Sequence, residues 1–463
     1  MTMAMILMYH RIFKSSRDPW ELCVSPEHFS EHLEVIKKLA QPCSLKELSR
    51  FLMEDNLPSN AIAVTFDDGY TDNLTNAKPL LVKHEIPATV FISSGYINHK
   101  VGFWWDQLTD IIFHTKVLPN SLNVKISEEL IFWKNEEQSI LTKEAGIDQP
   151  TVQKNYDNFH VRMNLYMFLY EKLIALPIKD QATALKQILT WADYFCVAQP
   201  DHIPMSAADL LTLIDGNLID IGAHTVSHPL LPSLPRETQY REIIDSKSSL
   251  EEITQRPVSF FAYPFGKFDQ VTLDIVKQAG FMSACTTEQN IVNHDTMRYT
   301  LPRLAVKDWD GEQFSIMLQS WLSGKHPSLI APKFDINTVI QFPLYEFQRK
   351  TGELRGNTIE CIPGKNLQGH CLYGSDFTIC HSGKYRIFVS LEQRNFTGAG
   401  RDVVIDVYEN RYVCKVLAEL EISKSNRYHL DFIAESGYRV EFRVYWREQS
   451  WLKVKEIQLI RLS

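Results

Sequence analysis

The run Ala61-Ile62-Ala63-Val64-Thr65-Phe66-Asp67-Asp68-Gly69 sets six uncharged residues directly before two carboxylates and a glycine. A short uncharged run of this kind predicts a β-strand buried on both faces, as in a parallel sheet. Asp67 and Asp68 then lie at the end of the strand, where adjacent carboxylates need a cation or hydrogen-bond donors. Gly69 allows a sharp turn after them. Taken alone, the same residues are also compatible with a capped helix start.

Strands and helices are predicted to alternate on both sides of this run. Residues 4–9 favour a first strand, and Ser25-Pro26 favours a helix start with serine as N-cap and proline in the first turn. A helix over 74–84 and a strand over 88–92 follow. The alternation returns later, with strands over 218–222, 258–263 and 282–286 and helices over 236–255 and 270–279. This order is typical of an α/β domain with parallel strands.

Two stretches break the alternation. Residues 103–204 carry helical patterns but few strand signals, so we expect a helical insertion or lid. Beyond residue 330, polar and apolar residues alternate in several runs separated by Gly, Asn and Ser, which predicts an all-β sandwich. We therefore expect an α/β domain over 1–325 and a β-sandwich over 330–463. The second would be either carbohydrate-binding or a structural or protein-contact domain.

The composition argues against several classes of protein. The 463 residues are 44% hydrophobic and 22% charged, as in globular proteins, and the net charge of −8 comes without a polybasic block that would suit nucleic acid. No stretch approaches the roughly 20 apolar residues of a membrane span. The apolar start lacks the cationic segment and cleavage site of a signal peptide, so we expect a buried strand there and a cytoplasmic protein.

A histidine pair follows the predicted strand over 218–222. In His224-Thr225-Val226-Ser227-His228 the spacing of four residues would place both imidazoles on one face of a helical turn, a frequent arrangement of metal ligands. Together with Asp68 they would form an open site of two nitrogen ligands and one oxygen ligand, which suits zinc or another first-row divalent ion. The alternative is that both histidines are satisfied polar residues of the fold.

A third segment, Phe260-Phe261-Ala262-Tyr263-Pro264-Phe265-Gly266, ends a predicted strand in a turn that contains proline and glycine. Such a turn frees backbone N–H groups to point into the cleft at the strand ends, where they would stabilise an oxyanion. The alternative is an ordinary turn.

In this order, the three segments resemble the polysaccharide deacetylases of carbohydrate esterase family 4, the NodB-homology family. Residues 65–69 match the motif T-F-D-D-G, residues 224–228 match H-[ST]-x-x-H, and residues 261–266 match F-R-x-P-[YF]-G except at Ala262. The resemblance covers roughly residues 4–310. It implies a distorted (β/α) barrel with a helical insertion, and a hydrolase that removes acetyl groups from N-acetylated amino sugars of a glycan.

The resemblance also implies residue roles. The ligands of a divalent ion, zinc or alternatively nickel, cobalt or manganese, would be Asp68, His224 and His228. Asp67 would act as general base. A backbone N–H of the turn at Tyr263 and Phe265, preferably that of Phe265, would face the oxyanion.

Two departures from the family pattern indicate one of its branches. The third-motif arginine, which steadies the base, is Ala262 here, and the late L-x-x-H motif that supplies an acid histidine is not recognisable between 300 and 330. Both departures, with Met8-Tyr9-His10-Arg11-Ile12, resemble the bacterial poly-N-acetylglucosamine deacetylases, in which the domain is circularly permuted. His10 is then the candidate acid, or else a structural residue. Arg303 would supply the missing cation near Asp67.

Other interpretations stay open. Trp104 and Trp105 begin a predicted helix and would form either a sugar-stacking wall or part of the core. An esterase acting on O-acetylated xylan could use the same machinery, and a carbohydrate-binding protein could keep the fold without catalysis. The intact carboxylate and histidine motifs favour an enzyme.

Overall fold

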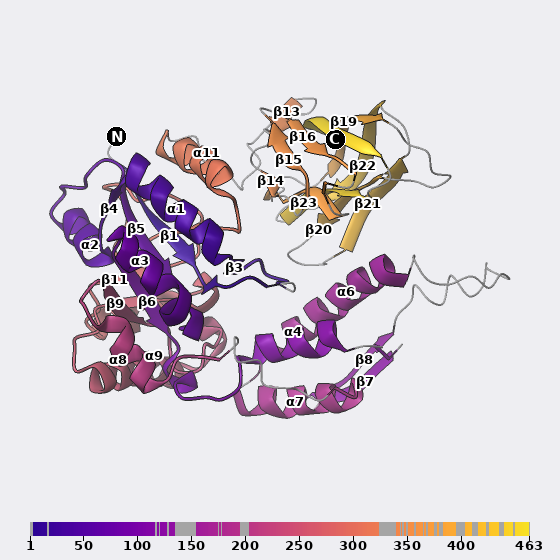
Figure 1. Ribbon diagram of the computed structural model, residues 1–463. Helices are drawn as coiled ribbons and strands as arrows, with labels where there is room; N and C mark the ends of the chain where they lie inside the picture. The colour runs from indigo at the N-terminus through magenta and orange to yellow at the C-terminus, as the bar shows by residue number, and fades with distance from the viewer. Residues whose placement is uncertain are drawn as a thin grey trace. The chain divides into compact units, whose positions relative to one another are not determined.

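The computed structural model forms two compact units, Met1–Gly311 and Glu312–Ser463 (Figure 1). It describes residues 3–15, 18–115, 118–119, 121–126, 129–134, 154–174, 176, 178–194, 203–323, 339–342, 344, 347–348, 351–355, 358–363, 365–366, 369–374, 377–378, 383–394, 403–409, 415–422, 426–434, 439–447 and 450–462. The linker predicted between residues 325 and 330 lies outside these ranges, so the predicted boundary stays a prediction.

The first unit is built on a parallel sheet whose strands include the short uncharged runs of the sequence. Its strands are β1 (Ala4–Tyr9), β4 (Gln41–Pro42), β5 (Ala61–Phe66), β6 (Ala88–Ile92), β9 (Ile219–Ala223), β10 (Phe260–Ala262), β11 (Ser283–Cys285) and β12 (Leu304–Ala305). They lie in the order β11-β10-β9-β6-β5-β1-β12, with β4 beside β5. Because β1, β5 and β6 are buried along their whole length, they carry no polar alternation.

The sheet curls toward closure as a barrel. After β11 the chain returns so that Leu301 pairs in parallel with Cys285 at one edge of the sheet. A few residues later β12 pairs in parallel with β1 at the other edge. One short segment therefore joins both edges, and the predicted deacetylase-type barrel is confirmed. Parallel strands share one carboxyl end, so the residues that follow β1, β5, β9 and β10 meet at the same end of the barrel.

Helices connect the strands. They are α1 (Pro26–Leu39), α2 (Leu45–Met53), α3 (Lys78–His84), α8 (Ala207–Ile214), α9 (Arg236–Thr254) and α10 (Gln270–Gln278), with short turns η1 (Asn73–Ala77), η2 (Ser94–Tyr96), η4 (Leu231–Ser233) and η5 (Pro264–Gly266). Ser25 is the N-cap of α1, as predicted, and its hydroxyl oxygen accepts from the His28 amide at 3.3 Å. A small pair, β2 (Arg11–Ile12) and β3 (Cys23–Val24), follows β1.

The insertion is not entirely helical. It contains α4 (Trp104–His114), α6 (Lys154–Ile174) and α7 (Ile178–Trp191), but also an antiparallel hairpin of β7 (Ser121–Ile126) and β8 (Glu129–Lys134). The three helices fit the predicted helical insertion, but the hairpin was not predicted. Exposed and buried side chains alternate strictly along β7, a period-two pattern too short to stand out among helical neighbours.

The second unit holds two antiparallel sheets, as the predicted β-sandwich requires. One runs in the order β15-β16-β24-β19-β22 with β13 beside β24, and the other in the order β14-β17-β23-β20-β21 with β18 beside β23. Their buried faces supply one apolar core that includes Ile387, Val444 and Trp446. The elements are α11 (Gly311–Leu322), β13 (Val339–Phe342), β14 (Phe347–Gln348), β15 (Glu353–Arg355), β16 (Thr358–Cys361), β17 (Gly369–Gly374), β18 (Phe377–Thr378), β19 (Gly383–Arg394), β20 (Val403–Glu409), β21 (Lys415–Ile422), β22 (Asn426–Ala434), β23 (Arg439–Trp446) and β24 (Trp451–Arg461).

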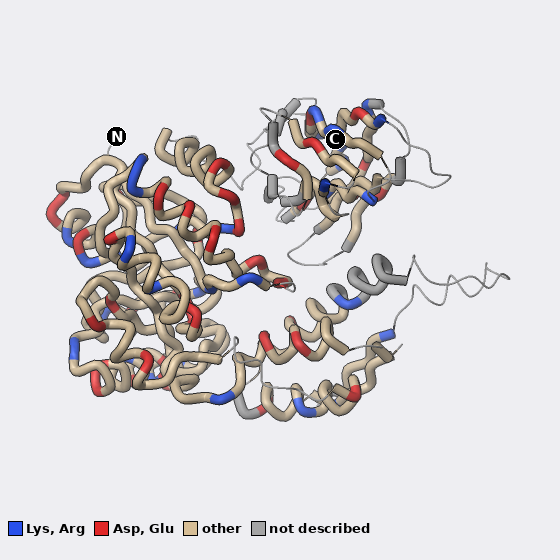
Figure 2. Tube along the Cα trace, in the orientation of Figure 1, with Lys and Arg blue, Asp and Glu red and all other residues tan. Residues whose placement is uncertain are grey.

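Charged residues of both signs are interspersed along the chain in Figure 2. None of the helices in the described ranges has the length and apolar character needed to cross a membrane.

Candidate metal centre

Asp68 stands in a tight turn at the carboxyl end of β5. Its φ of 74° is unusual for a residue with a side chain, and Gly69 follows with a φ of 90°. A Cβ on Gly69 would come within 2.8 Å of the Ile92 side chain, so the turn requires glycine for its space as well as its conformation. This turn breaks the alternation of an extended strand. Asp67 and Asp68 can therefore face different partners within one site.

His224 and His228 lie on a loop after β9, and the helical turn predicted for them was wrong. Thr225 and His228 both have positive φ, 64° and 56°, which a right-handed helix excludes. The His228 amide donates to the Thr225 hydroxyl oxygen at 3.0 Å, and this bond folds the loop back on itself. The two imidazoles still meet, with ring centroids 4.7 Å apart.

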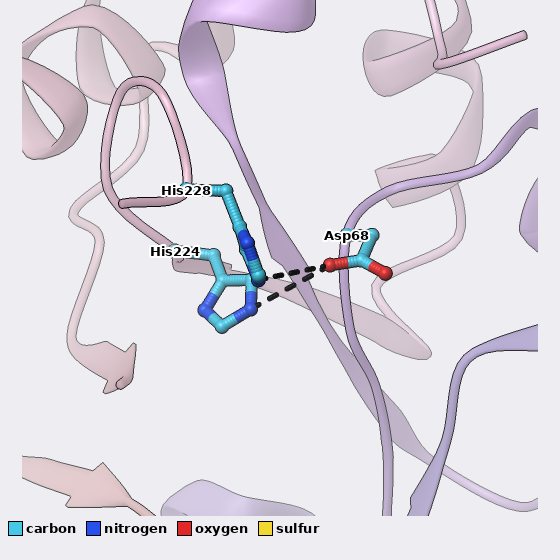
Figure 3. Close-up of side chains that lie close together, drawn as sticks. All are labelled: Asp68, His224 and His228. Atoms are coloured by element: carbon cyan, nitrogen blue, oxygen red, sulfur yellow. Dashed lines mark ion pairs between the residues drawn. The ribbon is translucent and has the colours of Figure 1, made fainter. Parts of the chain in front are cut away.

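Asp68 faces both histidines (Figure 3). Its Oδ1 lies 3.6 Å from Nε2 of His224 and 3.5 Å from Nε2 of His228, and the three ligand atoms all lie within 4.8 Å of one another. Neighbouring corners of a tetrahedron with bonds of roughly 2 Å lie about 3.3 Å apart, so the 3.5 Å and 3.6 Å spacings between carboxylate and imidazoles suit one cation.

The surroundings of the two imidazole rings support this fit. Nδ1 of His224 lies 2.8 Å from the Ala262 carbonyl oxygen, an acceptor that fixes the proton on Nδ1 and turns the lone pair of Nε2 toward Asp68. Nδ1 of His228 is buried without a hydrogen-bond partner. A lone pair that points at a carboxylate oxygen is unfavourable unless a proton or a metal ion lies between them. The donor set is therefore that of a cation site.

Burial disfavours the ionised form of each of the three ligand side chains. It raises the pKa of Asp68 well above its ordinary value, and the charges of Asp67 and Asp106 raise it further. Burial also lowers the pKa of His224, and it lowers that of His228 well below its ordinary value. Two neutral imidazoles beside a carboxylate that resists ionisation are what a divalent ion would stabilise.

Asp67 is held by Arg303. The guanidinium donates from Nη1 to Oδ1 at 2.7 Å and from Nη2 to Oδ2 at 2.6 Å, and both side chains are buried. Arg303 also donates to the Thr286 carbonyl and the Thr65 hydroxyl, which fix its position. Burial alone would raise the pKa of Asp67, but the charge and hydrogen bonds of Arg303 outweigh it and hold that pKa well below its ordinary value.

His10 follows β1 at the same end of the barrel. Its backbone carbonyl accepts from the Asn73 amide group at 2.8 Å, while the half-buried imidazole makes no hydrogen bond within the described part of the chain. Burial lowers the pKa of His10 to about 4, and the charge of Asp67 opposes that shift. The ring is therefore within electrostatic range of Asp67, and none of the described residues competes with Asp67 for it by a hydrogen bond.

The turn after β10 offers one backbone donor rather than two. The Tyr263 amide donates to the Cys285 carbonyl at 3.1 Å and its hydroxyl donates to the Tyr299 carbonyl at 3.0 Å, so Tyr263 does not serve an oxyanion as predicted. Phe265 has a φ of 57°, and its amide donates to no backbone carbonyl outside the turn among the described residues. Its ring packs edge-on against His228, with centroids 4.6 Å apart.

Trp104 and Trp105 are buried, so the predicted sugar-stacking wall is wrong and the alternative of core packing holds. They are 3% and 6% exposed, and Phe103 stacks on Trp105 at 4.6 Å. The Trp105 ring does border the site, because its centroid lies 4.8 Å from that of His228.

The prediction missed three residues around these ligands. The Trp105 indole N–H donates to the Tyr70 hydroxyl, which donates to Asp106 at 2.9 Å. Glu242 of α9 accepts from the amides of Val226 and Ser227. Tyr70 directly follows the first motif and could have been suspected from that place. Asp106 and Glu242 carried no comparable signal, because nothing local ties them to the motifs.

The comparisons with known proteins agree with the motifs. The family model described as polysaccharide deacetylase matches residues 54–115 and 185–284. The Bacillus subtilis protein YxkH, named as a polysaccharide deacetylase, is 21% identical over 318 residues, which are 68% of this chain and 76% of YxkH. The Staphylococcus aureus poly-beta-1,6-N-acetyl-D-glucosamine N-deacetylase is 26% identical over 186 residues, 33% of this chain and just under two thirds (64%) of that protein.

Among solved structures, the Streptococcus pyogenes deacetylase PplD in complex with acetate aligns with 69% of this chain and 98% of its own, at 18% identity and a TM-score of 0.43.

Proposed function

We propose that this chain, which belongs to the polysaccharide deacetylase family, removes N-acetyl groups from a glycan that contains N-acetylglucosamine. The observation that carries the proposal is the convergence of Asp68, His224 and His228 beside an Asp67 that Arg303 keeps ionised. Metal-assisted hydrolysis of an acetamide uses a Lewis acid, a base and a proton donor close together. The O-acetyl esterase and the non-catalytic binding protein are not favoured.

Asp68, His224 and His228 would hold the divalent ion, and two nitrogen ligands with one oxygen ligand suit zinc before nickel, cobalt or manganese. Such an ion, when bound, acidifies water and polarises an acyl oxygen. The backbone N–H of Phe265 would add a hydrogen bond to the same oxygen.

Asp67 would accept the proton of the attacking water. Its low pKa makes it a weak base at rest, so the proton is held only briefly and is available to the leaving group. His10 would deliver a proton to the departing nitrogen. Its pKa of about 4 leaves the ring neutral at pH 7, so it must gain that proton during the reaction, and the proton that Asp67 takes from the water would be its source.

The test is acetate release by the purified chain from β-1,6-linked N-acetylglucosamine oligomers, beside acetylated xylan, with metal content measured on the same sample. We expect a stoichiometric divalent ion, activity on the N-acetyl oligomers, and loss of that activity in Asp67→Asn. Release from xylan alone would establish the esterase instead, and an unchanged rate in Asp67→Asn would refute the assigned base. The cytoplasmic location and a carbohydrate-binding role for the second unit stay predictions.

A further inference from the structure

We infer that Glu242 is a positioning residue that holds the histidine loop, residues 224–228, in the conformation in which both histidines face Asp68. The inference rests on the proposed metal site. Glu242 lies on α9 and touches neither ligand ring in the contacts described, so its effect would pass through the backbone between them.

The Glu242 carboxylate accepts three hydrogen bonds from the middle of the loop. Oε2 accepts from the amide of Val226 at 2.9 Å and from that of Ser227 at 2.8 Å, and Oε1 accepts from the Ser227 hydroxyl at 2.7 Å. The Val226 amide also reaches the Glu242 carbonyl oxygen at 3.1 Å. Hydrogen bonds to an ionised acceptor are roughly twice as strong as those between neutral groups. One side chain thus satisfies two successive amides midway between the two ligands.

The opposite side of the loop is held by η2. The Ser94 amide donates to the Thr225 carbonyl at 3.0 Å, and the Gly95 amide donates to the Val226 carbonyl at 2.8 Å. A Cβ on Gly95 would lie only 2.6 Å from the Val226 oxygen, so this contact depends on glycine. The loop is therefore clamped between donors from η2 and acceptors from α9.

The clamp is needed because the loop is strained. Thr225 is β-branched and has a φ of 64°, and His228 has a φ of 56°. Such conformations are unfavourable for residues with side chains and persist only where the surroundings impose them. Without the Glu242 carboxylate, the amide and hydroxyl of Ser227 lose their acceptor, the Val226 amide keeps only the Glu242 backbone carbonyl, and the loop can relax. His228, at the far end of the loop, would then leave the position that faces Asp68.

Glu242→Gln tests this with little change in shape. The amide is neutral and has one oxygen in place of two, so the bonds from the Val226 and Ser227 amides lose the negative charge of their acceptor, and the Ser227 hydroxyl can no longer donate to an oxygen of its own. Glu237→Gln is the matched control, since Glu237 lies on the same helix but pairs with Arg241 at the surface, where both side chains are about 70% exposed. Ser227→Ala removes the hydroxyl bond alone and is the milder variant if Glu242→Gln does not fold.

Two measurements on the full chain test whether Glu242 positions the histidine loop. Zn²⁺ affinity, measured by competition with a chromophoric chelator, should fall about 10- to 100-fold in Glu242→Gln, less in Ser227→Ala, and not in Glu237→Gln. Amide hydrogen exchange over residues 224–228 in the metal-free chain should accelerate in Glu242→Gln and not in the control.

Affinity within twofold of the parent, together with unchanged exchange, would overturn the inference. If the parent binds no divalent ion, the proposed function fails, and the exchange measurement still decides whether Glu242 holds the loop.

Discussion

Replacing Arg303 by methionine should destabilise the first unit strongly. Methionine keeps much of the length of the side chain but donates no hydrogen bond, so the buried Asp67 carboxylate loses both donors, and the Thr286 carbonyl and Thr65 hydroxyl lose theirs. Removing one partner of a buried ion pair typically costs about 3–5 kcal/mol, because the other charge remains buried. We expect a loss of this size at pH 7.

The loss should depend on pH, and its sign follows from the pKa of Asp67. In the parent, Arg303 holds that pKa below the unfolded value, so ionised Asp67 contributes stability above about pH 4 that is lost as the pH falls through the folded pKa. In Arg303→Met, burial remains and raises the pKa above the unfolded value. The penalty then grows by about 1.4 kcal/mol per pH unit above pH 4, until the raised pKa is reached.

Urea unfolding followed by tryptophan fluorescence at pH 5 and pH 7 measures both effects. Arg241→Met, which breaks an exposed pair with Glu237, is the control and should change stability by less than about 0.5 kcal/mol. Adding Asp67→Asn to Arg303→Met should recover part of the loss, because it removes the unpaired charge. A loss below about 1 kcal/mol, or one equal at both pH values, would refute the reasoning.

Three further substitutions probe the site. Asp68→Asn should reduce Zn²⁺ affinity by more than about 100-fold, measured by chelator competition, and parental affinity would exclude Asp68 as a ligand. His10→Gln should slow acetate release from an N-acetyl oligomer about 10²- to 10⁴-fold but affect an aryl acetate less, since an amine is the poorer leaving group; equal losses would contradict an acid role. Trp105→Phe removes the 2.8 Å bond to Tyr70 and should cost about 1–3 kcal/mol in urea unfolding, whereas an unchanged midpoint would show that the bond contributes nothing.

The sequence predicts the barrel well because its signals there are local. β5 and β6 begin and end at the predicted residues, since an uncharged run stops where the strand leaves the buried sheet. The N-cap of α1 is equally local, because Ser25 and Pro26 determine it. The hairpin of β7 and β8 was missed because it lies between segments with helical patterns, and only β7 alternates polar and apolar residues. The closure through Leu301 and Cys285 joins segments that no local pattern relates.

At the candidate site too, the sequence predicts what depends on local motifs and misses what depends on distant contacts. Motif spacing identified the residues that meet at the metal centre, but not the shape of the loop that carries the histidines. That loop depends on Glu242, 14 residues beyond His228, and on amides of η2, which lie more than 120 residues earlier. The sequence could not decide whether Trp104 and Trp105 are exposed or buried. Aromatic residues at a helix start are buried only if other segments pack against them, and the sequence does not identify those segments.

Asp67 and Asp68 differ in the positive charge that is available to each of them. Both carboxylates are buried, and burial disfavours the charge of each. Arg303 offsets that effect at Asp67 with a matched pair of hydrogen bonds, but it cannot serve both, because its fork is already occupied by one carboxylate. Asp68 faces two neutral imidazoles instead, neither of which supplies a positive charge. A proton on Asp68 would neutralise it and could be donated to only one of the two ring nitrogens, whereas a divalent ion would bind all three groups. Because Arg303 is already paired with Asp67, a metal ion is the partner that best fits Asp68.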